Sequence, residues 1–241
     1  MNGGEETCVA SDAAELARLG AELMARAITE AIGARGVARI ALSGGSTPSE
    51  AYQRLAALAL PWDQTEWYWV DERAVGPEHP RSNYGAARRD LAAARVPEAR
   101  FFRMEGEAPD LAGAAARYEA LLRARFGVAA AAAFDVMTLG IGDDAHTASL
   151  FPGTGAAHIE DRLVAAIPAQ PDKGLEARLT LTAPVIREAR LKLLLARGAG
   201  KRDVVAQAKR PGPADEVPAR VARGGAGRLV WLLDAAAAQV A

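Results

Sequence analysis

The sequence predicts an α/β fold in which helices cover both faces of a mostly parallel sheet. Two observations support this class: short apolar runs typical of buried strands alternate with helical stretches, and most connections between them are short. The chain has 241 residues, 50% of them hydrophobic, which is enough to bury a substantial core. No long linker or internal repeat interrupts the alternation, so we expect one α/β domain over residues 1–241.

The individual elements follow from local patterns. Apolar residues recur at helical spacing after the capping pair Ser11 and Asp12, which predicts a surface helix over about 12–32. A Gly-rich turn separates a predicted strand at 37–42 from a helix at 48–58, and Pro48 suits the first turn of that helix. Further strands are predicted at 66–71, 99–104, 134–142, 162–168, 177–182, 191–198 and 228–234, and further helices at 82–94, 111–126, 183–189 and 200–208.

Composition narrows the class of protein. The formal net charge is −1, without the basic balance typical of nucleic-acid binders. The single cysteine, Cys8, cannot form an internal disulfide, which favours a reducing cytoplasm. The N-terminus lacks the pattern of a signal peptide, and no apolar run is long enough to cross a membrane. We therefore expect a cytoplasmic protein without nucleic-acid or membrane partners, and the scarcity of exposed apolar signals favours a monomer.

A Gly-rich turn follows the first predicted buried strand. Ligands of open parallel sheets bind beyond the carboxyl ends of the strands, so this turn is a candidate site. Its glycines allow close approach of a ligand, while its hydroxyls and the free N–H groups of the following helix suit a phosphate. An ordinary capped strand-to-helix turn is the alternative. The candidate phosphate-binding residues are Ser43, Gly44, Gly45, Ser46 and Thr47.

Charged residues collect after two other predicted strands. The first group follows the strand at 66–71, and its arginines could hold an anion or stabilise a developing negative charge, although solvated surface charge would look the same. Two more cations, near the strands at 177–182 and 191–198, could face the same phosphate if those strands are neighbours. These candidates are Asp71, Glu72, Arg73, His79, Arg81 and Asn83 in the first group, and Arg178 and Lys201 in the second.

The segment "LGIGDDAHTASLFPG", residues 139–153, places His146 just after a predicted strand. Its "GIGDDA" matches a loose dinucleotide fingerprint, but Pro152 and Gly153 stop any continuous helix, so a nucleotide site is disfavoured. A histidine titrates near neutrality and can accept and return a proton. With Asp143 or Asp144 available to orient it, His146 is a candidate general base.

Four segments in order resemble the 6-phosphogluconolactonase family: "ALSGGSTPSEAY", "WVDERAVGPEHPRSNYGAARRDL", "LGIGDDAHTASLFPG" and "ARLTLTAPVI". The resemblance extends over about residues 35–235. It implies a modified Rossmann-like α/β fold of the sugar-phosphate isomerase and deaminase type. It also implies hydrolysis of 6-phospho-D-glucono-1,5-lactone to 6-phospho-D-gluconate in the oxidative pentose phosphate pathway. The implied partner is this small phosphorylated lactone, with no cofactor and no metal.

Carried over by residue, the resemblance implies a phosphate loop at residues 43–47 and a catalytic histidine at His146. The chemistry of lactone hydrolysis then suggests Asp144 to orient His146 and Arg73 to stabilise the oxyanion. The family usually has Pro-Asp-Gly-His where this chain has Asp143, Asp144, Ala145 and His146; if position 145 is left-handed, alanine costs on the order of 1 kcal/mol relative to glycine. The implied substrate-binding residues are Asp71, Glu72, Arg73 and Asn83, with Arg178 and Lys201 as phosphate or lactone contacts.

Two other functions compete with this interpretation. Glucosamine-6-phosphate deaminases resemble the chain at the same loops, but that family places a glutamate five residues after the loop histidine, where this chain has Phe151. A sugar-phosphate-binding domain without catalysis is the second alternative. No helix-turn-helix region precedes residue 35, which argues against an attached DNA-binding domain. Ser149 is a conceivable nucleophile, although no local histidine-acid arrangement in the sequence supports it.

Overall fold

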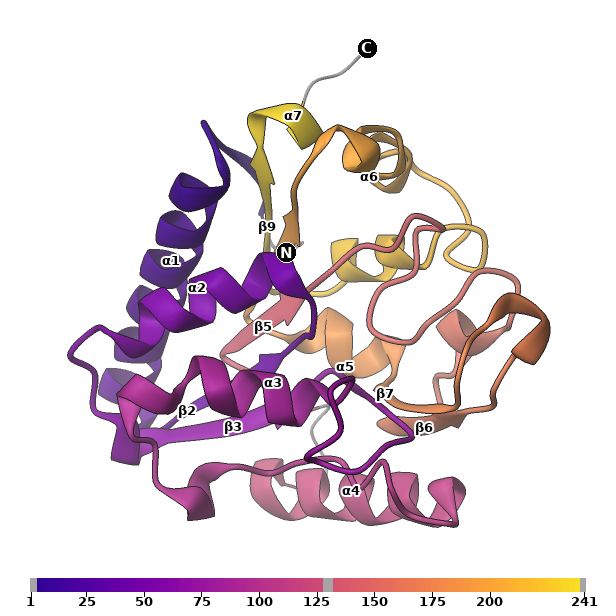
Figure 1. The fold of residues 1–241 in the computed structure, drawn as a ribbon, viewed down its shortest axis with the longest axis horizontal. Helices are drawn as coiled ribbons and strands as arrows, with labels where there is room; N and C mark the ends of the chain where they lie inside the picture. The colour runs from indigo at the N-terminus through magenta and orange to yellow at the C-terminus, as the bar shows by residue number, and fades with distance from the viewer. Residues whose placement is uncertain (1–3, 128–131, 239–241) are drawn as a thin grey trace.

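The main sheet contains six parallel strands in the order β1-β9-β8-β5-β2-β3 (Figure 1). This computed structural model describes residues 4–127 and 132–238. The order confirms the predicted α/β class with a mostly parallel sheet. The strands of the main sheet are β1 (Glu5–Ala10), β2 (Ala38–Leu42), β3 (Thr65–Trp69), β5 (Val136–Leu139), β8 (Leu191–Ala196) and β9 (Arg228–Asp234).

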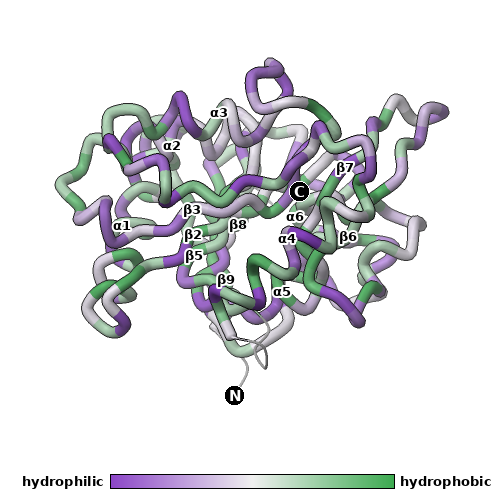
Figure 2. Tube along the Cα trace, turned by 90° about the horizontal axis from the view of Figure 1, so that it is seen from below, coloured by the Kyte–Doolittle hydropathy of each residue, from purple (hydrophilic) through white to green (hydrophobic). Residues whose placement is uncertain are grey.

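A second, smaller sheet contains three antiparallel strands in the order β4-β7-β6, and Figure 2 shows β6 and β7 set apart from the strands of the main sheet. Its strands are β4 (Asp71–Arg73), β6 (Val164–Ile167) and β7 (Arg178–Leu181). The prediction of one strand over 66–71 is therefore wrong, because the chain leaves the main sheet after Trp69 and enters the second sheet at Asp71. No glycine or proline marks this change of sheet in the sequence.

Helices cover both faces of the main sheet. Residues of α1, α2 and α3 form one apolar cluster with one face, and residues of α4 to α7 and of the second sheet form another cluster with the opposite face. The helices are α1 (Ala13–Arg35), α2 (Ser46–Ala56), α3 (Asn83–Asp90), α4 (Leu111–Phe126), α5 (Ala183–Glu188), α6 (Arg202–Lys209) and α7 (Ala235–Ala238). None of the helices in the described segments is both long and apolar enough to span a bilayer.

Strand β8, which is apolar except for Lys192, shows why the central strands lack an alternation of apolar and polar residues. Successive side chains of a strand point to opposite faces of the sheet. Leu193 and Leu195 belong to the cluster under α1 and α2, whereas Leu194 and Ala196 belong to the cluster on the opposite face. Because both faces are covered, every position of the strand is buried, as expected for a parallel sheet between two helical layers.

Two other local predictions differ from the structure. Strand β1 was not expected, because it lies at the edge of the main sheet, pairs only with β9 and is mostly exposed, so it carries no apolar signal. The predicted strand at 99–104 is wrong, since only an isolated bridge joins Phe101 to Trp67 there. The sequence suggested a strand because Phe101 and Phe102 are adjacent aromatic residues. Both pack against apolar clusters, as residues of a short strand would, although they form no strand.

Lys192 in β8 is fully buried, and its Nζ donates to the carbonyl oxygens of Arg187 at 3.0 Å and Gly224 at 2.7 Å. Burial lowers the pKa of Lys192 to about 8. These hydrogen bonds join β8 to the end of α5 and to the turn before β9.

We predict that Lys192 makes stability depend on pH above neutrality. Its folded pKa lies below the ordinary lysine value, so between pH 8 and about 10.4 the unfolded chain holds more protons and the Lys192 contribution to stability rises with pH. Urea denaturation of wild type and Lys192→Met at pH 7.5 and 10 measures this. The free energy of unfolding of wild type, relative to the variant, should increase at the higher pH; an unchanged difference would contradict the assignment.

Candidate functional site

A cavity of about 280 Å³ lies at the carboxyl ends of the main-sheet strands. It is open to solvent and is lined by the turn after β2, by β4, by the loop after β5, by β7 and by the segment after β8. The structure brings most of the predicted site residues to the cavity wall, but Glu72, His79, Arg81, Asp143 and Asp144 do not line it. Those lining it are Ser43, Gly44, Gly45, Ser46, Thr47, Asp71, Arg73, Asn83, His146, Arg178 and Lys201.

The Gly-rich turn at 43–47 presents the N-terminus of α2 to the cavity. Gly45 is the N-cap residue, with a φ of 107° that favours glycine, and no side chain caps the helix. The first N–H groups of a helix have no acceptor within the helix, and the helix dipole adds positive potential there. Backbone donors of Ser46 and Thr47 are thus available to an anion in the cavity.

Buried hydroxyl groups hold this turn in place. Ser43 N donates to Thr138 Oγ1 at 2.9 Å, and Tyr52 Oη donates to Ser43 O at 2.9 Å. Burial raises the pKa of Tyr52 to about 12, so its hydroxyl keeps the proton that this hydrogen bond needs. The contacts connect β2, β5 and α2 directly beneath the turn.

Gly44 allows a close contact between the turn and Asn83. A Cβ atom at position 44 would lie 1.9 Å from Asn83 Oδ1. Asn83 cannot easily move away, because it is buried and its Nδ2 donates to Asp71 O at 2.9 Å and Asp71 Oδ1 at 3.1 Å. Glycine at position 44 therefore lets the Gly-rich turn and β4 line the same cavity.

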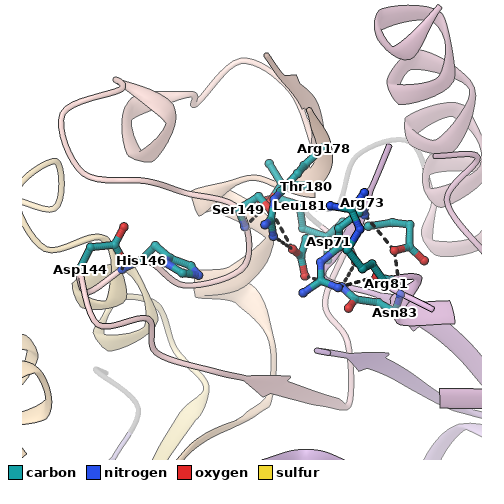
Figure 3. A network of polar contacts seen from close by, with 11 residues as sticks. Asp71, Arg73, Arg81, Asn83, Asp144, His146, Ser149, Arg178, Thr180 and Leu181 are labelled. Carbon is teal, nitrogen blue, oxygen red and sulfur yellow. Dashed lines mark hydrogen bonds and ion pairs between the residues drawn. The ribbon is translucent and has the colours of Figure 1, made fainter. Parts of the chain in front are cut away.

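Asp71 is the centre of a buried polar network in the wall of the cavity (Figure 3). Its Oδ2 accepts a hydrogen bond from Ser149 Oγ at 2.7 Å and lies 3.6 Å from Arg178 Nη1. Ser149 is fully buried and does not line the cavity. Its hydroxyl serves Asp71, which supports the expectation that Ser149 is not a nucleophile.

Two arginines of this wall have donors without protein partners. The Nε atoms of Arg73 and Arg178 are buried and make no hydrogen bond with any described residue. An unsatisfied guanidinium donor is costly, and such groups commonly face a ligand. Arg73 is held from its other end, where Nη1 donates to Arg81 O, and Arg81 itself pairs with Glu176 at 2.8 Å. Both arginines are placed to bind an anionic or polar group.

Glu72 was predicted to contact the ligand, but it is buried and does not line the cavity. Its carboxylate is 2% exposed and accepts hydrogen bonds from the backbone N–H groups of Arg73, Asn83 and Tyr84 and from Ser82 Oγ. Burial raises the pKa of Glu72, and these hydrogen bonds oppose the shift only in part. Glu72 thus fixes the N-terminus of α3 and the backbone of Arg73, and it acts beneath the cavity surface.

His146 and Asp144 form a pair on the loop after β5, across from the Asp71 network in Figure 3. His146 Nδ1 lies 2.6 Å from Asp144 Oδ1, which also accepts from the His146 backbone N–H at 3.1 Å. Burial alone would raise the pKa of Asp144, but the hydrogen bonds and the charge of His146 outweigh it and lower that pKa. Asp144 is thereby kept ionised, and it holds the His146 ring by its Nδ1 edge. Of the two aspartates considered from sequence, Asp144 is the one that contacts the histidine.

The loop around His146 is tightly packed. A Cβ at Gly142 would lie 2.1 Å from His146 Nδ1, so the ring rests against bare backbone. The ring centroid of Phe151 is 4.7 Å from that of His146. Ala145 has a φ of 68°, which confirms the left-handed conformation considered from sequence, and Ala148 has a φ of 48°. The Ala145 carbonyl accepts from Ala219 N at 3.0 Å, which holds the strained residue.

Two cations complete the rim of the cavity. Lys201 Nζ donates to Ile141 O at 2.8 Å and lies 2.6 Å from Asp143 Oδ1. Arg197, directly after β8, also lines the cavity, and its Nη1 lies 2.6 Å from Glu50 Oε1 on α2. Sequence reasoning missed Arg197, although the rule that found the other candidates, inspection of residues just after each strand, would have selected it. Within the described residues, no three His, Cys, Asp or Glu side chains gather as metal ligands.

The fold that carries this cavity is that of a known class of sugar-phosphate enzymes. The chain matches the family of glucosamine-6-phosphate isomerases/6-phosphogluconolactonases over residues 11–231 and belongs to that family.

Among its relatives, the 6-phosphogluconolactonase of Synechocystis sp. is 42% identical over 211 residues, covering 86% of each chain. The human 6-phosphogluconolactonase is 35% identical over 239 residues, covering 96% of this chain and 92% of its own. The solved 6-phosphogluconolactonase of Trypanosoma brucei superposes with a TM-score of 0.83 at 28% identity, covering 99% of this chain and 98% of that one. A monomeric glucosamine-6-phosphate deaminase shares the fold, with a TM-score of 0.80 at 22% identity.

We predict that Ala145→Gly costs little stability. Glycine would relieve the left-handed strain, worth about 1–2 kcal/mol, and this offsets the lost methyl packing and the greater freedom of the unfolded chain. The control is Ala114→Gly, since Ala114 is equally buried, at 2% exposure, but lies inside α4. Its replacement should cost about 1–2 kcal/mol. Equal losses in urea denaturation would contradict a strained Ala145.

Proposed function

We propose that the protein hydrolyses 6-phospho-D-glucono-1,5-lactone to 6-phospho-D-gluconate, as a step of the oxidative pentose phosphate pathway, with His146 as the general base. The observation that carries this proposal is that one cavity is lined by an anion-binding helix terminus, by cations and by a histidine that a carboxylate orients. The relatives named 6-phosphogluconolactonase support the same reaction.

In this proposal the phosphate of the substrate binds at the N-terminus of α2. The N–H groups of Ser46 and Thr47 and the nearby cations Lys201 and Arg197 supply donors and positive charge. Phosphate binding does not change during hydrolysis, so its binding energy serves to fix the lactone ring in the cavity. Asp71 and Asn83 are then positioned to meet the ring hydroxyls, since both line the same cavity.

The chemical step begins at His146. Asp144 holds Nδ1, which leaves Nε2 to accept a proton from water as the water oxygen attacks the lactone C1. The carbonyl oxygen of C1 becomes an oxyanion, which the positively charged guanidinium of Arg73 in the cavity wall would stabilise. The tetrahedral intermediate then collapses, the bond between C1 and the ring oxygen breaks, and protonated His146 returns its proton to that oxygen.

The products are a carboxylic acid and a hydroxyl group, and the acid releases one proton at neutral pH. Water supplies all the added atoms, so the reaction needs no further reactant. Ser149 has no part in it, because its hydroxyl is buried and donates to Asp71. A deaminase reaction is disfavoured, because the apolar ring of Phe151 stands beside His146 where a deaminase has a glutamate.

We predict that His146→Ala lowers kcat at least a hundredfold, the usual contribution of a general base. His158→Ala is the matched control, since His158 is exposed and does not line the cavity. Asp144→Asn should give an intermediate loss in kcat, because the ring remains but loses its orienting charge. Proton release on adding freshly generated lactone, corrected for spontaneous hydrolysis, measures all four proteins.

Three results would contradict the proposal in different ways. Wild type that does not accelerate hydrolysis but binds 6-phosphogluconate would be a sugar-phosphate-binding domain without catalysis. Equal kcat for wild type and His146→Ala would remove the histidine from the mechanism while leaving the activity. Equal losses from His146→Ala and His158→Ala would indicate a general effect on folding rather than on chemistry.

A further inference from the structure

Asp143 has no role in the mechanism above, yet it contacts a cation that the mechanism uses. Its Oδ1 lies 2.6 Å from Lys201 Nζ, and its side chain is 89% exposed. Its neighbour Asp144 contacts His146 instead, so the two adjacent aspartates pair with different residues of the cavity wall.

Lys201 has two contacts with different effects: one holds its ammonium in position, and the other neutralises the ammonium charge. The carbonyl of Ile141, at 2.8 Å, holds the ammonium against the loop after β5 without neutralising it. Asp143 adds a full negative charge at 2.6 Å. An ammonium has three N–H donors, so Ile141 and Asp143 occupy two and leave one for a ligand in the cavity.

A phosphate that binds Lys201 would share this ammonium with the Asp143 carboxylate. Two anions on one cation repel each other, and this weakens the binding of the phosphate. The carboxylate can leave at little cost, because an exposed ion pair is worth little and a side chain that is 89% exposed is readily solvated. Asp143 is therefore a competitor for the phosphate, and it is not needed to hold Lys201 in place.

We infer that Asp143 is a specificity-determining residue that competes with the substrate phosphate for Lys201 and so lowers the affinity of the cavity for phosphorylated ligands. This inference rests on the proposed function for the identity of the substrate, but phosphate binding tests it without turnover. The competition affects only ligands that carry the phosphate. It acts on binding and leaves the chemistry at His146 unchanged.

The test compares Asp143→Asn with wild type and with Asp63→Asn, in isothermal titration of inorganic phosphate at low ionic strength. Asparagine keeps the size of the side chain and removes the charge. Asp63 is an exposed carboxylate that does not line the cavity, so its replacement gives the same change in net charge. Asp143→Asn should bind phosphate roughly two- to fivefold more tightly than either other protein. The difference should shrink in 0.5 M salt, because exposed charges are screened.

Kinetics with the lactones provides the second readout. Asp143→Asn should lower KM for the phosphorylated lactone by the same factor, leave kcat unchanged, and leave KM for unphosphorylated glucono-1,5-lactone unchanged. Asp144→Asn should instead lower kcat. If Asp143→Asn binds phosphate no more tightly than Asp63→Asn, the competition does not exist; weaker binding would mean that Asp143 positions Lys201. Either result overturns the inference. Failure of lactone hydrolysis by wild type would instead overturn the proposed function, and the phosphate titration would still decide the role of Asp143.

Discussion

The geometry of the site depends on Val70, whose backbone hydrogen-bonds to both sheets. Val70 N donates to Leu42 O at 2.9 Å in the main sheet, and Val70 O accepts from Leu181 N at 2.8 Å in the second sheet. The strand that begins in the main sheet thus continues into another sheet without a turn, and Asp71 and Arg73 follow at its carboxyl edge. Glu72, buried between them, then fixes the start of α3 through its hydrogen bonds. This arrangement places Asp71, Arg73 and Asn83 in the cavity wall beside the Gly-rich turn.

The charges around the cavity are arranged to receive an anion without a large rearrangement. Each of the cations Arg178, Lys201 and Arg197 is paired with a protein carboxylate, and the carboxylates differ in exposure. Asp71, the partner of Arg178, is buried and fixed by further hydrogen bonds, so that pair belongs to the rigid framework. The partners of Lys201 and Arg197 are exposed and can yield to a ligand. Preorganised donors of this kind lower the cost of binding and of stabilising charge during the reaction.

Most of the fold and the site could be predicted from the sequence because burial leaves a strong local pattern. The helix at 111–126 has the predicted bounds, and the strands around 136–139 and 191–196 lie within predicted apolar runs. The site residues were found by inspecting the positions just after each predicted strand, because ligands of parallel sheets bind beyond the carboxyl ends of the strands. The four motifs then indicated the family. Tertiary contacts without a local pattern were missed: β1 is an exposed edge, and the change of sheet at Val70 has no turn residue. The sequence could not show that the Glu72 carboxylate is buried, because a sequence gives the charge of a side chain but not whether the side chain points into the protein or toward a ligand.

The central claim is that one end of the cavity holds the phosphate and the other end holds the lactone carbon against His146. A crystal structure of the protein with 6-phosphogluconate tests this most directly. The account predicts the phosphate within hydrogen-bond distance of the N–H groups of Ser46 and Thr47, and the C1 carboxylate beside Nε2 of His146 and the guanidinium of Arg73. A product bound in the opposite direction, with its phosphate between Arg73 and Arg178 and its carboxylate at the start of α2, would contradict the account.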